Sequence, residues 1–259
     1  MRKILASAIL ALALPVQAST ATSDWTDLWW NPNESGWGVN VIQQADILFL
    51  TFFVYAADGS PRWYSASDMR YNSNSGTTLT FQGALYETRG VLNGGATQYR
   101  EVGDAIISFT SLNAATMTYT ADGNLVSKQL QRYTFRLNNL AGSFMGMLLG
   151  TYSNCASGLG YQEELSALTI THTSSGSVTI SSSGDTSCQF QGTYSQVGRL
   201  GAITGSVTCT SASGSGSGTF HFFDFEPAIS GLVGRGTMNL GEGCTWSGRV
   251  GWLKRFASS

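Results

Sequence analysis

The sequence has little charge, little proline and no strong excess of either sign. Of its 259 residues, 14 are Lys or Arg, 16 are Asp or Glu and only 4 are Pro, whereas 42% are apolar. This composition excludes a disordered chain rich in acidic or basic residues. A net charge of -2 and the lack of any Lys/Arg run leave no basic surface for a phosphate backbone, so we expect no nucleic-acid partner.

Histidine is nearly absent, which limits metal and catalytic chemistry. Only His172 and His221 occur, and the cysteines are spaced 33, 21 and 35 residues apart with no C-x-x-C pair. Zinc sites normally combine closely spaced ligands, so we expect no metal and no cofactor. A G-x-S-x-G elbow is also missing, which disfavours a serine hydrolase.

No hydrophobic run reaches the roughly 20 residues that are needed to span a bilayer. The apolar run at residues 4–14 follows Arg2 and Lys3 and precedes a V-x-A cleavage site that ends at Ala18. These features predict a secretory signal peptide over residues 1–18. We therefore expect an exported protein, secreted or periplasmic, with no transmembrane segment after cleavage.

All four cysteines lie in the C-terminal half of the chain. An even number of cysteines in an exported protein favours disulfides over free thiols. Cys188 and Cys209 lie symmetrically about a turn at residues 196–199, so a hairpin would place them opposite each other. Cys155 then pairs with Cys244 and links the first strand of this half to its last, as closure of a barrel requires.

Apolar and small polar residues alternate along most of the chain, and no window of a dozen residues has helical periodicity. This pattern predicts an all-β protein whose strands have one solvated face. The Asp58-Gly59 and Asp122-Gly123 dipeptides predict type I′ hairpin turns, the first of which would place Val54 opposite Trp63. The expected strands lie near 36–44, 47–57, 61–69, 78–88, 100–111, 114–121 and 124–136, then near 148–153, 164–172, 177–182, 187–195, 201–209, 217–225, 228–238 and 243–253.

These strands predict two antiparallel meander domains, at residues 19–139 and 140–259. We expect each to be a small up-and-down β-barrel, since closure removes exposed sheet edges; two β-sandwiches are the alternative. The Gly/Ser-rich stretch at 211–218 is interpreted as a hairpin loop, and Glu163-Glu164 as a solvated loop.

Tryptophan is concentrated in the segment 27–40, where three of the seven indoles surround a Pro/Gly turn. One interpretation is a buried plug, in which the turn asparagines cap their own backbone and Glu34 accepts N–H bonds. The other is a ligand platform, in which indoles stack on a flat ligand and polar side chains bind its rim. The predicted binding residues are Trp29, Trp30, Asn31, Asn33, Glu34, Trp37, Arg62 and Trp63.

Four motifs carry a resemblance to known proteins. They are W-W-N-P-x-E-S-G-W-G at 29–38, D-G-x-P-x-W at 58–63, C-x-F-x-G-x-Y-x-Q-x-G at 188–198 and C-T-W-S-G-R at 244–249. The first two resemble a group of largely uncharacterised exported bacterial β-rich proteins, and the last two resemble domains attached to such proteins. The resemblance implies an exported β-rich module and assigns no catalytic residue.

From the sequence we expect an exported binding or interaction protein rather than an enzyme, with a glycan or a small hydrophobic molecule as ligand. A structural cell-envelope or surface-assembly protein, with another envelope protein as partner, is one alternative. A hydrolase that uses Glu34, with Asp68 as a conceivable second carboxylate, is another. An outer-membrane barrel is disfavoured, because the second faces of the expected strands are rich in Ser and Thr and lack a lipid-facing apolar stripe.

Overall fold

The computed structural model describes residues 24–56, 58–75, 78–90, 94, 98–156, 158, 160–212 and 214–255. The predicted signal peptide lies outside these residues. No helix long and apolar enough to cross a membrane occurs in the described part of the chain. The described residues form two compact units: 24–26 with 35–129, and 27–34 with 130–255.

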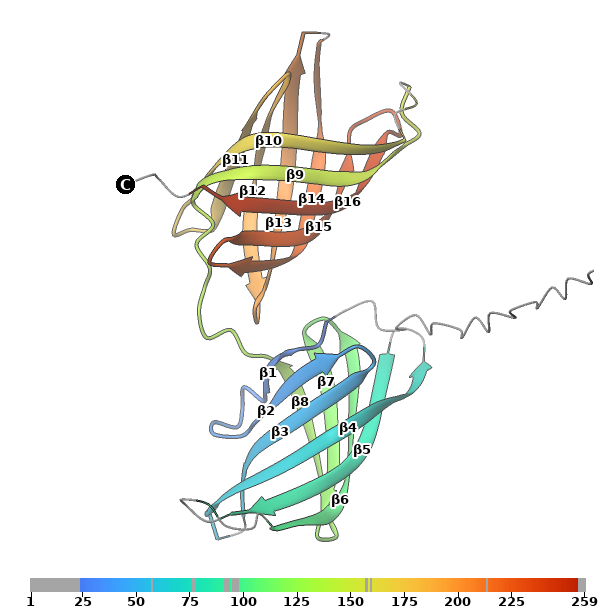
Figure 1. Ribbon diagram of the computed structural model, residues 1–259, viewed down its shortest axis with the longest axis vertical. Helices are drawn as coiled ribbons and strands as arrows, with labels where there is room; N and C mark the ends of the chain where they lie inside the picture. Colours follow the sequence, from blue (N-terminus) through green and yellow to red (C-terminus); the bar gives the residue numbers. More distant parts are fainter. Residues whose placement is uncertain are drawn as a thin grey trace, which may run out of the picture. The chain divides into compact units, whose positions relative to one another are not determined.

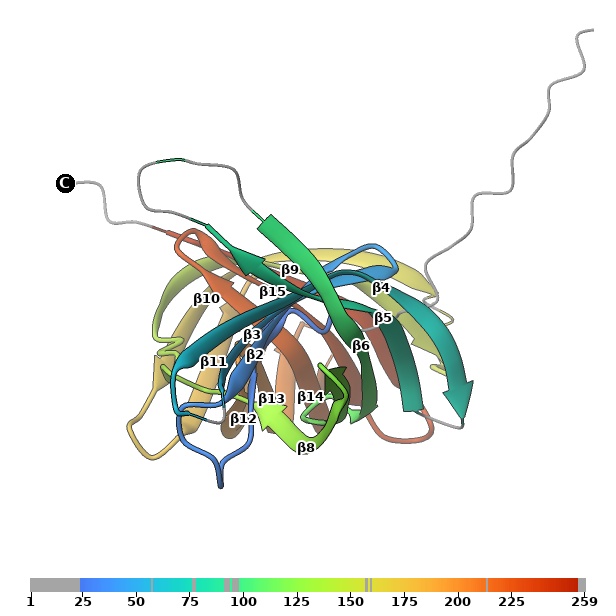
Figure 2. The ribbon, with the colours of Figure 1, turned by 90° about the horizontal axis from the view of Figure 1, so that it is seen from below.

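The protein is all-β, and its strands close into two eight-stranded antiparallel meander barrels, as predicted (Figures 1 and 2). The strands of the first barrel are β1 (Asp27–Trp30), β2 (Gly38–Gln44), β3 (Ile47–Tyr55), β4 (Pro61–Ser75), β5 (Thr78–Arg89), β6 (Gln98–Ser111), β7 (Ala114–Ala121) and β8 (Asn124–Arg132). Those of the second are β9 (Gly142–Ser153), β10 (Tyr161–His172), β11 (Ser177–Ser183), β12 (Thr186–Val197), β13 (Leu200–Ser211), β14 (Gly214–Ala228), β15 (Gly231–Asn239) and β16 (Thr245–Lys254). The predicted domain boundary falls between β8 and β9.

Inward-facing glycines make room for the large side chains of the second barrel. A Cβ atom at Gly150 would lie 2.6 Å from the indole of Trp246, and one at Gly248 would lie 2.8 Å from it. Gly236 likewise faces Phe222, at 2.5 Å from its ring. Small and large residues therefore interdigitate across the interior, as is usual in narrow barrels.

Both predicted disulfides are present. Cys188 and Cys209 are direct partners in the β12–β13 ladder and are bonded to each other. Cys155, which follows β9, is bonded to Cys244, which precedes β16. The second bond therefore joins the two strands whose pairing closes the barrel.

A buried ion pair joins β1 and β8, the first and last strands of the first barrel. Both of its residues belong to the second compact unit. Arg132 Nη1 donates to Asp27 Oδ2 at 2.9 Å, and the two side chains are 0% and 4% exposed. The same oxygen accepts the backbone N–H of Arg199 at 3.1 Å. A side chain at Gly198 would collide with this carboxylate, because a Cβ atom there would lie 2.2 Å from Oδ2. Glycine is therefore required beside the ion pair.

Several expected strand limits were wrong. β1 was not anticipated, because its four residues were interpreted as part of the tryptophan turn. β9 begins at Gly142 rather than 148, since its outward Met145 and Met147 are as apolar as its inward positions and hide the alternation. Residues 214–218 are strand rather than loop, because their backbone continues the β13–β14 ladder. Glu163 and Glu164 lie within β10 rather than in a loop.

The two Asp-Gly turns differ. Asp122 and Gly123 both have positive φ angles, of 50° and 80°, as a type I′ turn requires. The turn at Asp58 is longer than expected, because Ala56 and Ser60 are hydrogen-bonded across it. Trp63 consequently pairs with Phe53 and not with Val54. A shift of one residue moves a side chain to the other face of a sheet, so Trp63 faces outward.

Candidate functional site

The predicted tryptophan platform is distributed over both units. In the second unit, Trp29 is 1% exposed and the guanidinium of Arg132 lies over its ring, 5.0 Å from the centroid. Trp30 is half-buried and contacts the ring of Tyr133 edge-on, with centroids 4.9 Å apart. Trp29 is thus a core residue, held in place by a cation above its ring.

The turn that follows these indoles is held by its own side chains. Asn31 Oδ1 accepts the backbone N–H of Asn33 at 3.0 Å, and Asn31 Nδ2 donates to Glu34 Oε1 at 3.1 Å. The backbone N–H of Glu34 also donates to the carbonyl of Asn31. Asn31 thus caps its own backbone, as the plug interpretation expected of both asparagines in the turn. Asp68, the conceivable second carboxylate of a hydrolase, forms an exposed ion pair with Arg70.

The remaining predicted residues lie in the first unit and have different neighbours. Trp37 is half-buried, and its indole N–H donates to the hydroxyl of Tyr119 at 3.5 Å. Arg62 and Trp63 are adjacent on β4, so they point to opposite faces of the sheet. Trp63 is 58% exposed on the outer face, where its ring contacts Phe53 edge-on at 5.1 Å.

Arg62 instead belongs to an ion-pair cluster around a buried carboxylate. Glu87, whose side chain is 5% exposed, accepts from Arg62 at 2.6 Å and from Arg100 at 2.8 Å. Arg100 also pairs with Asp122. Burial raises the pKa of Glu87, but the hydrogen bonds from Arg100 and Arg62 outweigh it and bring the pKa below its ordinary value. The acidic and basic side chains of this cluster thus pair with one another.

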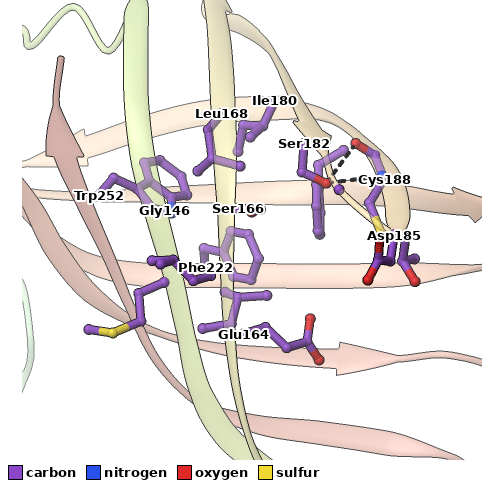
Figure 3. Close-up of a pocket in the computed structure, with 16 residues that line it drawn as sticks. Gly146, Glu164, Ser166, Leu168, Ile180, Ser182, Asp185, Cys188, Phe222 and Trp252 are labelled. Atoms are coloured by element: carbon purple, nitrogen blue, oxygen red, sulfur yellow. Dashed lines mark hydrogen bonds between the residues drawn. The ribbon is translucent and has the colours of Figure 1, made fainter.

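The second barrel holds a cavity that the sequence did not predict (Figure 3). Its volume is about 270 Å³, and β9, β10, β11, β12, β14 and β16 contribute to its wall. The buried part of the lining is aliphatic and aromatic: Leu168, Ile180, Phe190, Phe222 and Trp252. Such a surface is suited to the apolar part of a small ligand.

Polar groups form the rest of the lining. Glu164 and Ser166 reach the cavity from β10, on the same face of the strand as Leu168. Glu164 Oε1 accepts the hydroxyl of Tyr152 at 2.7 Å. Burial and this hydrogen bond raise the pKa of Tyr152, so the phenol remains a donor. Asp185 lies at the β11–β12 turn; Figure 3 shows Asp185 at the right and Glu164 below the centre.

The β11–β12 side of the cavity is fixed by hydrogen bonds and a disulfide. The hydroxyl of Ser182 accepts the backbone N–H of Cys188 at 3.0 Å and donates to its carbonyl at 3.4 Å, as the dashed lines of Figure 3 show. Cys188 lines the cavity and is bonded to Cys209 on β13. This part of the wall is therefore held in place before any ligand arrives.

The inward positions of β10 were the signal that could have indicated this site. Glu164, Ser166 and Leu168 follow one another at every second residue. Taken as a strand, this order predicts a barrel interior that becomes polar toward one end. Comparison of the chain with family models, with curated proteins and with solved structures finds no match. The chemistry of the site is therefore inferred from its lining residues alone.

Proposed function

We propose that this protein is an exported, non-enzymatic binding protein that holds a small molecule in the cavity of its second barrel. The observation that carries the proposal is the cavity itself, which has an apolar floor and a few polar groups at one side. Eight-stranded barrels are just wide enough to hold one small ligand. The two disulfides are compatible with the oxidising environment that export provides.

The volume limits the size of the ligand. A dry apolar cavity of about 150 Å³ accommodates benzene, and ordinary ligand pockets begin at about 300 Å³. At about 270 Å³, this cavity suits one aromatic ring with a short chain. The polar side then orients the end of that chain.

Titration calorimetry with 2-phenylethanol tests the proposal. We expect binding with a dissociation constant of about 0.1 to 1 mM, which is typical of a ligand with so few atoms. Ser166→Leu places a branched side chain in the cavity and is expected to weaken binding by more than about tenfold, because the ligand and the new side chain compete for one space.

The matched control is Ala167→Leu. It adds the same side chain at the next position of β10, which points away from the cavity. This variant should bind 2-phenylethanol as the wild type does. The proposal is overturned if the wild type binds no member of a panel of such single-ring compounds, or if both variants bind equally well.

A second candidate function, glycan binding, is supported by the outer aromatic face of the first barrel. Trp63, Phe53 and Tyr55 are all exposed there. Aromatic rings with one open face are large apolar surfaces that sugar rings can cover. We expect retention of the protein on at least one of cellulose, chitin and peptidoglycan, and about tenfold weaker retention of Trp63→Ala.

The control for glycan binding is Phe135→Ala, which removes another exposed aromatic ring from the segment between β8 and β9. It should leave retention unchanged. Equal retention of wild type and Trp63→Ala, or no retention on any of the three polymers, would argue against this second function.

A further inference from the structure

We infer that the cavity of the second barrel selects ligands that carry a positive charge, namely primary amines with an aromatic or short alkyl body. This inference rests on the proposed function, since it names the ligand class of the same site. Its basis is the charge of the lining. Of the sixteen described residues that line the cavity, Glu164 and Asp185 are acidic and none is Lys, Arg or His.

The carboxylate of Glu164 is already oriented for such a contact. The Tyr152 hydroxyl donates to Oε1 at 2.7 Å, and the described residues provide no other hydrogen bond to the Glu164 side chain. A carboxylate accepts about four hydrogen bonds, so capacity remains for an ammonium group, which has three donors. The Tyr152 bond also limits the rotation of the side chain, which lowers the entropy cost of binding.

The apolar floor makes this contact selective. A ligand whose ring covers Phe222 and Trp252 places its polar end toward the polar side of the cavity. A charge-assisted hydrogen bond there is stronger than a neutral one. An anionic ligand would instead face Glu164 and Asp185 with no cation among the described lining residues, which disfavours it.

Three compounds of nearly equal shape separate charge from fit: 2-phenylethylammonium, 2-phenylethanol and phenylacetate. By titration calorimetry we expect the ammonium ion to bind about tenfold more tightly than the alcohol, and phenylacetate to bind more weakly than either. Raising the salt from about 0.15 M to about 1 M should reduce the preference for the ammonium ion and leave the alcohol unaffected.

Glu164→Gln tests the residue, and Glu163→Gln is its matched control. The two glutamates are neighbours on β10, so they point to opposite faces, and Glu163 bonds the hydroxyl of Tyr161 outside the cavity. Glu164→Gln should weaken the binding of 2-phenylethylammonium by about tenfold and change the affinity for 2-phenylethanol by less than about twofold. Glu163→Gln should change the affinity for neither compound.

The outcomes separate the two levels of the proposal. If the alcohol and the ammonium ion bind equally, or if Glu164→Gln and Glu163→Gln behave alike, the charge selectivity is overturned while binding in the cavity stands. If none of the three compounds binds, the proposed function itself is overturned. Tighter binding of phenylacetate than of the ammonium ion would reverse the inferred selectivity.

Discussion

Replacing Cys155 and Cys244 together by alanine is expected to lower the free energy of unfolding of the second unit by roughly 4.5 kcal/mol. The bond spans 89 residues, so its removal releases a long closed loop in the unfolded state. It also removes the covalent link beside the β9–β16 pairing that closes the barrel. Denaturant-induced unfolding, followed by near-ultraviolet circular dichroism, measures the change.

The second disulfide is the matched control. Cys188 and Cys209 are 21 residues apart, and their replacement by alanine is expected to cost roughly 3.3 kcal/mol because the released loop is shorter. The order of the two losses is the informative result. A larger loss for the Cys188/Cys209 variant would mean that loop length does not determine the stabilisation.

Asp27→Ala is expected to destabilise the second unit by about 3 to 5 kcal/mol. The variant leaves the fully buried guanidinium of Arg132 without this carboxylate and removes the acceptor of the Arg199 backbone N–H. A buried charge that loses its partner is far more costly than an exposed one. The measurement is the free energy of unfolding from urea titrations.

Two further variants test the cause of this loss. Asp68→Ala breaks the exposed pair with Arg70 and should cost less than about 1 kcal/mol. Adding Arg132→Met to Asp27→Ala also removes the buried guanidinium that has lost this carboxylate, and should restore part of the lost stability. If the double variant is less stable than Asp27→Ala alone, the loss does not come from the buried guanidinium that has lost the Asp27 carboxylate.

The architecture was predictable because the backbone pattern repeats along the whole chain. Along β7 and the C-terminal half of β10, buried residues alternate with more exposed ones, as expected for a strand of a small barrel. The disulfide pairing followed from the same reasoning, since the two halves of a hairpin place symmetric residues opposite each other. The first half of β9 was not predicted, because its outward residues are apolar and the sequence there does not alternate.

The binding cavity was not predictable from local motifs. Its lining comes from single inward positions on several strands, for example Glu164, Ser182 and Trp252, which are far apart in the sequence. The tryptophan-rich segment 27–40, which is the most conspicuous motif, did not indicate the cavity. Trp29 fills the core, and the one-residue register difference at the Asp58 turn places Trp63 on the outer face. Local composition identifies large side chains, whereas register decides which side of the wall they reach.

The pairing of β9 with β16 also constrains how the chain is made. The strand that completes the second barrel is the last to be synthesised, so β9 lacks one of its two neighbours until residue 254 has been added. From the completion of β9 until β16 is made, the growing polypeptide therefore has an open sheet edge, and such edges pair readily with other chains. The second barrel can therefore close only after β16 has been made, at the slow rate that contacts between distant segments impose.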